Sequence, residues 1–428
     1  MSRRTGRSLV LLMIILLISS LCMSSCNLIG LGLKDNDEYL TKDEVQNMIK
    51  NNMGDNVTVE GGDNYDITIN GVENDNVAAA KALLCSVSIR CVFRTVSYGM
   101  SYQPGASTGR EKTSAGSGVI YKLDKNNGDA YILTNYHVVY YNQSDTENGI
   151  SDNITVYLYG QESSDYAIPA TYVGGSMNYD LALLKVDGSR ILAESNATEA
   201  DLADSDEVAV LDRAIAVGNP AALGISATLG YINVESEYIR MEGADGATEI
   251  QIRVMRTDTA VNSGNSGGGL FNSKGELIGI VNAKLNNTDN MGYAIPSNFV
   301  KSVADNILHY CDGTDLENVY RCYLGIVVSP SKLYTVYDEE TGKVHKREQI
   351  SVISTEKGGL AEGVLLEGDV INSITVDGVT YEVDKMYIVT DSMLSARVGS
   401  VVSIRVTRGN ETLDLNIEIT EKSLTLIK

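Results

Sequence analysis

Short apolar runs dominate the chain between about Val77 and Tyr310, where they recur at intervals of roughly 8 to 15 residues. Gly, Asn and Asp separate the runs. Examples are Ser86–Ile89, Gly118–Tyr121, Ala130–Leu133, Ile154–Tyr159, Leu181–Val186, Val208–Leu211 and Leu277–Val281. Regular short strands with turn signals between them predict a sandwich or a barrel. The 40 Gly and only five Pro, with no Trp, fit a β-rich fold with many tight turns.

The length of 428 residues is enough for two or three domains, at about 100 to 200 residues per domain. A helix is expected at about Ser297–Leu308, where the first series of strands ends. A polar joint, Asp312–Asn318, follows it, and a second set of strands with one helix-like segment fills the rest. We therefore expect two folded domains, at residues 77–311 and 318–422.

The charge balance is acidic, with 34 Lys and Arg against 56 Asp and Glu, a formal net charge of -22. No Lys/Arg-rich run offers a stripe for phosphate groups, so a nucleic-acid partner is not expected. Apolar residues make up 43% of the chain, which is enough to build real cores. The six Cys are too few for a disulfide scaffold of this length.

The first 26 residues have the shape of an export signal: Arg3, Arg4 and Arg7 precede an apolar run, Leu9–Ile18, and small residues that end in Cys26. The segment Met23–Cys26 resembles a bacterial lipobox, whose cleavage leaves a lipid-modified cysteine as the first residue. An uncleaved single-span anchor and a plain secreted form are the alternatives. All three place the body of the chain outside the cytoplasm.

Residues 27–76 are expected to form an acidic spacer that holds the body of the chain off the membrane. A short helix is predicted at Thr41–Met53, because Thr41 is a candidate N-cap with Glu44 three residues on. A hairpin-like stretch follows, with Asn56–Glu60 and Asp66–Asn70 on either side of Gly61 and Gly62. A flexible leader without a role explains the same residues equally well.

The strongest local signal is the Gly/Ser-rich run Asn262–Phe271, with Ser266 at its centre. So many glycines suit a tight turn whose backbone N–H groups converge beside the Ser266 hydroxyl. Acyl transfer needs that combination, a nucleophile with donors aimed at the oxyanion that develops on the attacked carbonyl. A Gly/Ser loop without chemistry is the alternative when the run is considered alone.

Two further residues support the catalytic interpretation. His137 follows an apolar strand, and Asp180 directly precedes a run expected to be buried. A carboxylate there needs a hydrogen-bonding partner, because a buried unpaired charge is costly. His137 would supply that partner. The order His137, Asp180, Ser266 is the order of the chymotrypsin-type proteases and not that of subtilisins or α/β-hydrolases.

With these residues in place, the region resembles the HtrA (DegP/DegS-type) branch of the trypsin-like serine proteases. The motifs that carry the resemblance are Thr134–Val139, Asp180–Val186, Ala216–Pro220, Thr257–Gly268 and Gly292–Ser297. It implies a mostly β fold, a chymotrypsin-like double β-barrel. Three places depart from the family pattern, Ser263, Gly269 and Gly230–Asn233, and none of them removes a catalytic group.

The resulting prediction is a serine-type endopeptidase. His137 takes the proton of the Ser266 hydroxyl, Asp180 fixes the imidazole tautomer, and Ser266 attacks the peptide carbonyl to form an acyl-enzyme. The oxyanion hole is expected at Gly264, Asn265 and Ser266, with backbone N–H groups of Gly264 and Ser266 as the donors. No metal or cofactor is expected, since His309 and His345 lack the spacing of a zinc site.

The resemblance places the substrate pocket at Ala260, Val281, Asn282 and Ala283. None of these positions carries a charged residue. We therefore expect a modest apolar P1 side chain such as Val, Ala or Leu, in preference to Arg or Lys.

The C-terminal region resembles a PDZ domain, an α+β fold with a partly open β-barrel. The matching segments are Tyr323–Ile326, Gly359–Gly363, Leu366–Ile371, Ser373–Gly378 and Val401–Arg408. The loop Tyr323, Leu324, Gly325 and Ile326 would bind a terminal carboxylate while an extended peptide pairs with a sheet edge. An insertion, Ser329–Gln349, contains a hairpin-turn signal at Asp338–Gly342 and either shields or extends that groove, or is a solvated loop.

The function predicted from these features is a membrane-tethered extracytoplasmic protease that degrades misfolded or signal-marked exported proteins. Its PDZ domain would capture exposed C-termini or regulate the site. The alternative is a peptide sensor or chaperone on a protease scaffold that cleaves weakly or not at all. A homotrimer is implied by the resemblance alone. The cysteines Cys311 and Cys322 flank the interdomain joint, and the sequence leaves their pairing open.

Overall fold

The computed structural model describes residues 75–95, 110–284, 291–311 and 319–427, without the side chains of 283 and 284. It also describes the backbone of β1 (Val57–Glu60) and β2 (Asp66–Ile69), which pair antiparallel as the hairpin expected there. The export signal with Cys26, the helix predicted at Thr41–Met53 and the joint at 312–318 lie outside the described residues.

Six antiparallel strands close the first barrel in the order β3-β4-β5-β8-β7-β6. They are β3 (Ser86–Thr95), β4 (Arg110–Asp124), β5 (Asp129–Thr134), β6 (Asn153–Leu158), β7 (Ile168–Ser176) and β8 (Leu181–Val186). In β6 the alternation of apolar and polar residues buries Ile154, Val156 and Leu158 on one face. Nearly all of β8 is buried, as its continuous apolar run predicts.

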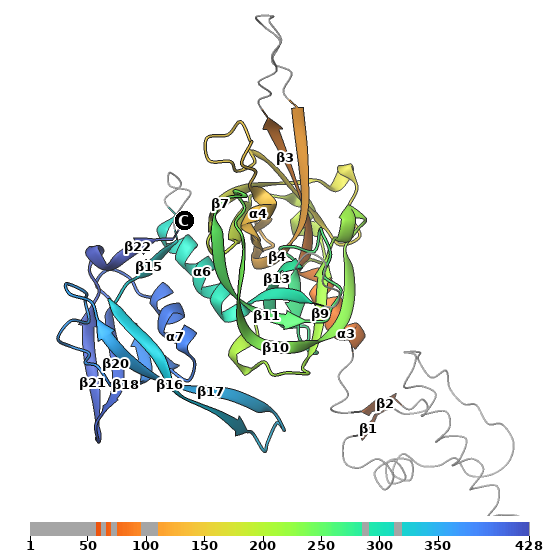
Figure 1. The fold of residues 1–428 in the computed structure, drawn as a ribbon. Helices are drawn as coiled ribbons and strands as arrows, with labels where there is room; N and C mark the ends of the chain where they lie inside the picture. Colours follow the sequence, from red (N-terminus) through yellow and green to blue (C-terminus); the bar gives the residue numbers. More distant parts are fainter. Residues whose placement is uncertain are drawn as a thin grey trace, which may run out of the picture. The chain divides into compact units, whose positions relative to one another are not determined.

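A second closed barrel of six strands follows, in the order β10-β11-β14-β13-β12-β9. They are β9 (Arg213–Gly218), β10 (Ser226–Glu242), β11 (Glu249–Thr257), β12 (Gly269–Phe271), β13 (Leu277–Lys284) and β14 (Gly292–Pro296). Figure 1 shows β10 and β11 as long strands that run together across this barrel. The prediction of a mostly β, double-barrel fold is confirmed.

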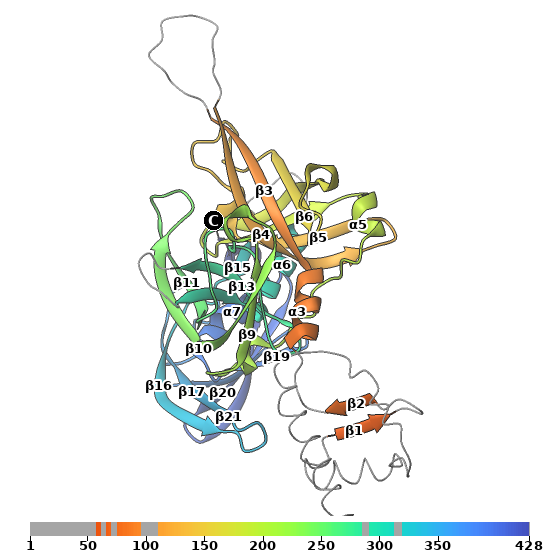
Figure 2. The same ribbon diagram turned by 90° about the vertical axis from the view of Figure 1, so that its right-hand side faces the viewer.

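Two helices pack on the barrels. In α3 (Asp75–Leu84) the small residues Ala78 and Ala82 are buried, and Figure 2 shows the helix beside β9. Residue Asp75 of α3 forms an ion pair with Arg213 of β9 at 2.6 Å. The helix α6 (Ser297–Tyr310) confirms the helix predicted at the end of the first series of strands and buries Val303 and Ile307. The short helix α4 (Tyr136–Val139) lies between β5 and β6, and α5 (Arg190–Glu194) lies between β8 and the first strand of the second barrel.

The C-terminal region has its own sheet and core. The sheet order is β16-β17-β18-β20-β21, with β19 paired to β18, and a separate pair joins β15 to β22. The elements are β15 (Tyr320–Cys322), β16 (Ile326–Tyr337), β17 (Val344–Thr355), β18 (Val370–Val376), β19 (Val379–Glu382), α7 (Met386–Asp391), β20 (Val401–Arg408), β21 (Glu411–Glu418) and β22 (Leu424–Leu426). Because β16 stands at one end of this order, it is an edge strand of the sheet.

The buried side chain of Asn306 ties α6 to the C-terminal region. Its amide nitrogen donates to the carbonyl oxygens of Tyr320 and Leu394, each at 2.7 Å. Its amide oxygen accepts from the backbone N–H of Tyr320 at 2.8 Å. One fully buried amide therefore satisfies three backbone groups of the C-terminal region, two at Tyr320 and one at Leu394.

The hairpin turn predicted at Asp338–Gly342 is confirmed between β16 and β17. The N–H of Asp338 donates to the carbonyl oxygen of Lys343, and the Asp338 carboxylate accepts from the residues of the turn. Beside the turn, the Lys343 ammonium group contacts the Asp212 carboxylate at 2.7 Å. The insertion is thus not simply a solvated loop, because its tip contacts the loop before β9.

The strand predicted at Val208–Leu211 is wrong. The structure has a loop there, in which the N–H of Ala209 binds the Asp212 carboxylate at 2.9 Å. Residue Leu211 has φ +72° and is 73% exposed. A positive φ at a branched residue breaks a strand, so β9 begins only at Arg213.

Four cysteines lie in the described residues, and all are free thiols: Cys85, Cys91, Cys311 and Cys322. The pairing of Cys311 with Cys322, left open by the sequence, is not formed. Burial raises the pKa of the Cys85 and Cys91 thiols to about 12. Within the described residues, no helix is both long and apolar enough to span a membrane.

Candidate active site

The predicted histidine and aspartate come from two connections of the first barrel. After β5 ends at Thr134, the single turn of α4 carries His137. Asp180 immediately precedes β8 and has φ +49°, a left-handed conformation that Asp tolerates better than most residues. The side chain of Asn135 donates to the Asp180 carbonyl oxygen at 2.8 Å, which holds this turn against α4.

The structure brings His137 and Asp180 into direct contact. The imidazole Nδ1 lies 2.7 Å from Asp180 Oδ2, and the backbone N–H of His137 donates to Oδ1 at 3.0 Å. The Asp180 side chain is 3% exposed, whereas that of His137 is 35% exposed. Burial alone would lower the pKa of His137, but the charge of Asp180 and its hydrogen bond outweigh this and raise it.

Asn282 in β13 contacts two of the predicted catalytic residues. Its side-chain amide nitrogen donates to Asp180 Oδ2 at 2.6 Å, and its backbone carbonyl oxygen accepts from the Ser266 hydroxyl at 2.9 Å. Sequence reasoning placed Asn282 in the substrate pocket and missed this role. No sequence signal could have shown it, because the contact depends on how the two barrels meet.

The loop around Ser266, called the nucleophile loop after its predicted role, is a tight turn, as predicted. Gly264 has φ +100°, and a Cβ there would lie 2.2 Å from the carbonyl oxygen of Asn219. Gly267 has φ +84°, and a Cβ there would lie 2.2 Å from Thr134 Oγ1. Both positions therefore require glycine. Two backbone hydrogen bonds of 2.8 Å hold the loop to β13. The N–H of Gly267 donates to the carbonyl oxygen of Val281, and the N–H of Val281 donates to the carbonyl oxygen of Gly268.

The three residues predicted for the oxyanion hole differ in their backbone donors. The N–H of Asn265 donates to the carbonyl oxygen of Asn262 at 3.0 Å, so it belongs to the turn. Within the part of the chain that the structure describes, no backbone carbonyl accepts from the N–H of Gly264 or Ser266. These two N–H groups are therefore not committed to another backbone group of the described residues, as their predicted role requires.

The residues predicted for the substrate pocket lie around the same loop. Ala260 is exposed, and its carbonyl oxygen accepts from the Asn265 side chain at 3.0 Å. The Val281 side chain is buried in the core of the second barrel, and that of Asn282 is committed to Asp180. Ala283 pairs with Tyr293 through the backbone, and its side chain is not described.

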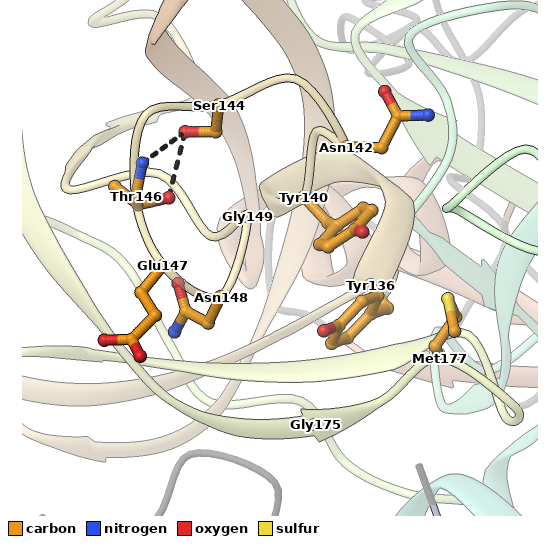
Figure 3. Close-up of a pocket in the computed structure, with 10 residues that line it drawn as sticks. All are labelled: Tyr136, Tyr140, Asn142, Ser144, Thr146, Glu147, Asn148, Gly149, Gly175 and Met177. Carbon is orange, nitrogen blue, oxygen red and sulfur yellow. Dashed lines mark hydrogen bonds between the residues drawn. The ribbon is translucent and has the colours of Figure 1, made fainter.

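A cavity of about 390 Å³ lies beside the helix that carries His137. Figure 3 shows the rings of Tyr136 and Tyr140 on one side of it, and the polar loop with Thr146 and Asn148 on the other. The two rings are stacked with their centroids 5.3 Å apart. None of the predicted catalytic residues lines this cavity.

The predicted carboxylate-binding loop lies between β15 and β16. Leu324 is buried in the core of the C-terminal region, and Gly325 has φ +73°. The carbonyl oxygens of Leu324 and Gly325 accept from Ala361 and Glu356. Tyr323 is exposed and donates its hydroxyl to Glu356 at 2.6 Å, while Ile326 opens the edge strand β16.

Two closed six-stranded barrels, with the imidazole–carboxylate pair on one and the glycine-flanked serine on the other, define a trypsin-like serine endoprotease. The family model described as trypsin-like peptidase domain matches residues 116–280.

Comparison with known proteins narrows the class further. The chain is 30% identical over 346 residues to the serine protease Do-like HtrA of Lactococcus lactis subsp. cremoris, covering 77% of each chain. It is 30% identical over 316 residues to the periplasmic serine endoprotease DegP of Escherichia coli, covering 72% of this chain and 57% of that one. A solved HtrA-type protease, AlgW with a tripeptide, is 26% identical with a TM-score of 0.47, covering 81% of this chain and 97% of that one. The chain belongs to the HtrA family of serine proteases.

Proposed function

We propose that the chain hydrolyses peptide bonds of misfolded or signal-marked exported proteins, with His137, Asp180 and Ser266 as its catalytic residues. The observation that supports this most directly is the 2.7 Å contact between His137 and Asp180, in the same site as a serine flanked by two available N–H groups. This combination provides a base, a group that orients the base, a nucleophile and oxyanion donors.

One proton passes through the imidazole in each half of the reaction. His137 accepts the hydroxyl proton of Ser266 while Oγ bonds to the carbonyl carbon. The imidazolium then donates that proton to the leaving amine, the C–N bond breaks and an acyl-enzyme remains. In the second half, His137 takes a proton from water, hydroxide attacks the ester and Ser266 Oγ leaves, regaining its proton from His137.

The charges of the site suit these steps. Asp180 is almost fully buried and accepts from the His137 ring, so it fixes the tautomer with the proton on Nδ1 and leaves Nε2 to act as the base. Its charge also stabilises the imidazolium that forms after each transfer, which is the cause of the raised pKa of His137.

Hydrolysis of casein by the wild type and by Ser266→Ala tests the catalytic assignment. Ser266→Ala should abolish hydrolysis, because the nucleophile is lost. Ser263→Ala is the matched control: its side chain is exposed and lies in the same loop, so its hydrolysis should equal that of the wild type. Equal residual activity in the wild type and Ser266→Ala would leave the alternative, a peptide-binding chaperone, as the better interpretation.

For the C-terminal region we propose a PDZ role, in which an extended C-terminal peptide adds to the edge strand β16. The available edge and the adjoining loop at Leu324–Ile326 support this role. Cleavage of a fluorogenic peptide should change when a C-terminal peptide is added. The same peptide with an amidated C-terminus is the control, since it lacks the carboxylate that the loop would bind.

Contacts between this region and the second barrel support a regulatory role as well. They concentrate on α7 and its N-cap: Lys385 contacts Glu235 at 3.0 Å, and the Tyr387 hydroxyl donates to Asp206 at 3.0 Å. The Asp391 carboxylate contacts Arg253 at 2.7 Å. A peptide that moved α7 would have to break polar contacts to the protease domain.

We also propose that the protease lies outside the cytoplasm and is anchored to a bacterial membrane. The name of one relative, a periplasmic endoprotease, supports the location, and the signal-like N-terminus supports the anchor. Cys26→Ala should move the protein from the membrane to the soluble fraction if Cys26 carries the lipid. An unchanged distribution would favour the single-span anchor.

For specificity we propose an apolar P1 preference, because the residues around Ala260 are uncharged. A cleavage profile dominated by basic P1 residues would overturn it.

A homotrimer is proposed from the resemblance. Light scattering of the soluble body should give three times the mass of one chain, and a monomeric mass would contradict it.

A further inference from the structure

The nucleophile loop can direct two N–H groups at an oxyanion only if its successive peptide units keep one orientation. Glycine alone does not fix them, because it has no Cβ and tolerates either orientation of a flanking peptide. The four carbonyl oxygens from residue 263 to residue 266 are all held. Backbone N–H groups bind three of them: Ala221 binds that of Ser263, Gly268 that of Asn265, and Ser117 that of Ser266.

The fourth carbonyl oxygen, that of Gly264, is held by a side chain. The Ser117 hydroxyl donates to it at 2.7 Å. The same hydroxyl accepts from the backbone N–H of Asn219 at 2.8 Å. Since that N–H occupies an acceptor position of the oxygen, the hydroxyl proton points to Gly264.

Ser117 is completely buried in β4, which belongs to the first barrel, whereas the loop it contacts belongs to the second. Its backbone pairs with Ser88 of β3, and that pairing does not need the hydroxyl. A buried hydroxyl is costly unless it is bonded, and both bonds of this one go to the loops that border the site.

We propose that Ser117 is a positioning residue for the oxyanion hole: its hydroxyl holds the carbonyl group of Gly264 and so keeps the N–H groups of Gly264 and Ser266 directed at the developing oxyanion. The inference rests on the proposed function, in which Ser266 is the nucleophile. Ser117 itself touches no reacting atom. It acts through the Gly264–Asn265 peptide unit, which without the hydroxyl is held only by the bond from the Asn265 N–H to the Asn262 carbonyl oxygen at 3.0 Å.

The test compares Ser117→Ala with the wild type. We expect kcat to fall about 10- to 100-fold with KM within about twofold, a smaller loss than removal of a donor, which costs about 100- to 1,000-fold. The boron of a peptide boronic acid bonds to Ser266 Oγ, the hydroxyl proton of Ser266 passes to His137, and one boron-bound oxygen occupies the oxyanion hole. The affinity for the boronic acid should fall by the same factor as kcat. The acidic limb of the pH profile should keep its midpoint, because His137 and Asp180 are untouched.

Ser86→Ala is the matched control. Its hydroxyl is equally buried, in the neighbouring strand β3, and donates only to the Ala82 carbonyl oxygen at 2.7 Å. It should lower the melting temperature as much as Ser117→Ala while leaving kcat unchanged. If Ser117→Ala does not fold, Ser117→Cys replaces it, because a thiol keeps the volume and is a weaker donor.

The outcomes separate this inference from the proposed function. Wild-type kcat and boronate affinity in Ser117→Ala, or in Ser117→Cys where that variant is needed, would overturn the positioning role. So would a loss of kcat that disappears after normalisation to the fraction of folded enzyme. If Ser266→Ala keeps full hydrolysis, the proposed function itself is wrong. If Ser266→Ala is inactive and Ser117→Ala behaves as wild type, only the role of Ser117 is wrong.

Discussion

The Ser266 hydroxyl donates to the backbone carbonyl oxygen of Asn282 at 2.9 Å, so in this structure the proposed nucleophile is bonded to β13. For catalysis, the hydroxyl has to turn and bond to the imidazole of His137. Catalytic hydrogen bonds of this kind commonly tighten only when substrate binds. The side-chain amide nitrogen of the same residue, Asn282, donates to Asp180 Oδ2 at 2.6 Å. One buried asparagine therefore contacts both ends of the proposed triad.

Replacing Asn282 by alanine should disturb Asp180 first. The carboxylate loses the amide donor on Oδ2, so its charge acts more strongly on His137 and the pKa of His137 rises further. We expect the acidic limb of kcat/KM to move to higher pH and kcat to fall roughly tenfold, the size expected for a lost hydrogen bond to a charged group. A pH–rate profile measures both, and an unmoved limb would contradict this account.

Asp180→Asn should move the acidic limb in the opposite direction. The charge of Asp180 raises the pKa of His137, so removing it lowers that pKa and extends the neutral imidazole to lower pH. The rate should nevertheless fall by about 10⁴, because an amide does not hold the required tautomer. Kinetics between acid and neutral pH test this, and a limb that shifts upward would show that Asp180 is not the dominant influence.

Gly264→Ala should inactivate the enzyme with little general loss of structure. Its Cβ would meet the carbonyl oxygen of Asn219 at 2.2 Å, and the loop must move to avoid it. Moving one oxyanion donor should lower kcat about 100- to 1,000-fold.

The matched control for that substitution is Gly160→Ala. Gly160 has φ +75°, and no atom lies within 4 Å of a Cβ placed there. The control carries the strain of a positive φ, about 1 kcal/mol of stability, without the clash. Its kcat should equal that of the wild type. If both variants lose activity equally, backbone strain and not displacement of the donor is the cause.

Arg253→Met should destabilise the contact between α7 and the second barrel. The Arg253 side chain is 5% exposed, and its guanidinium group lies 3.8 Å from the centre of the Tyr387 ring as well as 2.7 Å from Asp391. Removing it leaves the Asp391 carboxylate, which is 19% exposed, without its cation, at a cost of up to about 3 to 5 kcal/mol in the free energy of unfolding.

Urea unfolding of the single and double variants measures this. Arg253→Met/Asp391→Leu should recover most of the loss, because no charge is then left buried. Arg405→Met is the control, since its pair with Asp414 is exposed, and it should be indistinguishable from the wild type. A double variant as unstable as Arg253→Met would show that packing, and not charge, holds α7 in place.

Much of the fold could be predicted from the sequence because it depends on local periodicity. Alternating residues in β6, the continuous apolar run of β8 and the apolar face of α6 each identify their element. The failure at Val208–Leu211 has the same origin, since an apolar run there is indistinguishable from a strand until the side chain of Asp212 binds the N–H of Ala209.

The sequence by itself determined which residues could do chemistry here. Only a few side chains can serve as base, orienting acid and nucleophile, and their order and neighbouring motifs selected His137, Asp180 and Ser266. The tertiary structure alone decided what surrounds them. Asn282 lies 102 positions from Asp180, and Ser117 lies 147 positions from Gly264. Such pairs leave no periodic signal in the chain, because the closure of two barrels against each other, and not any local preference, brings them within hydrogen-bonding distance.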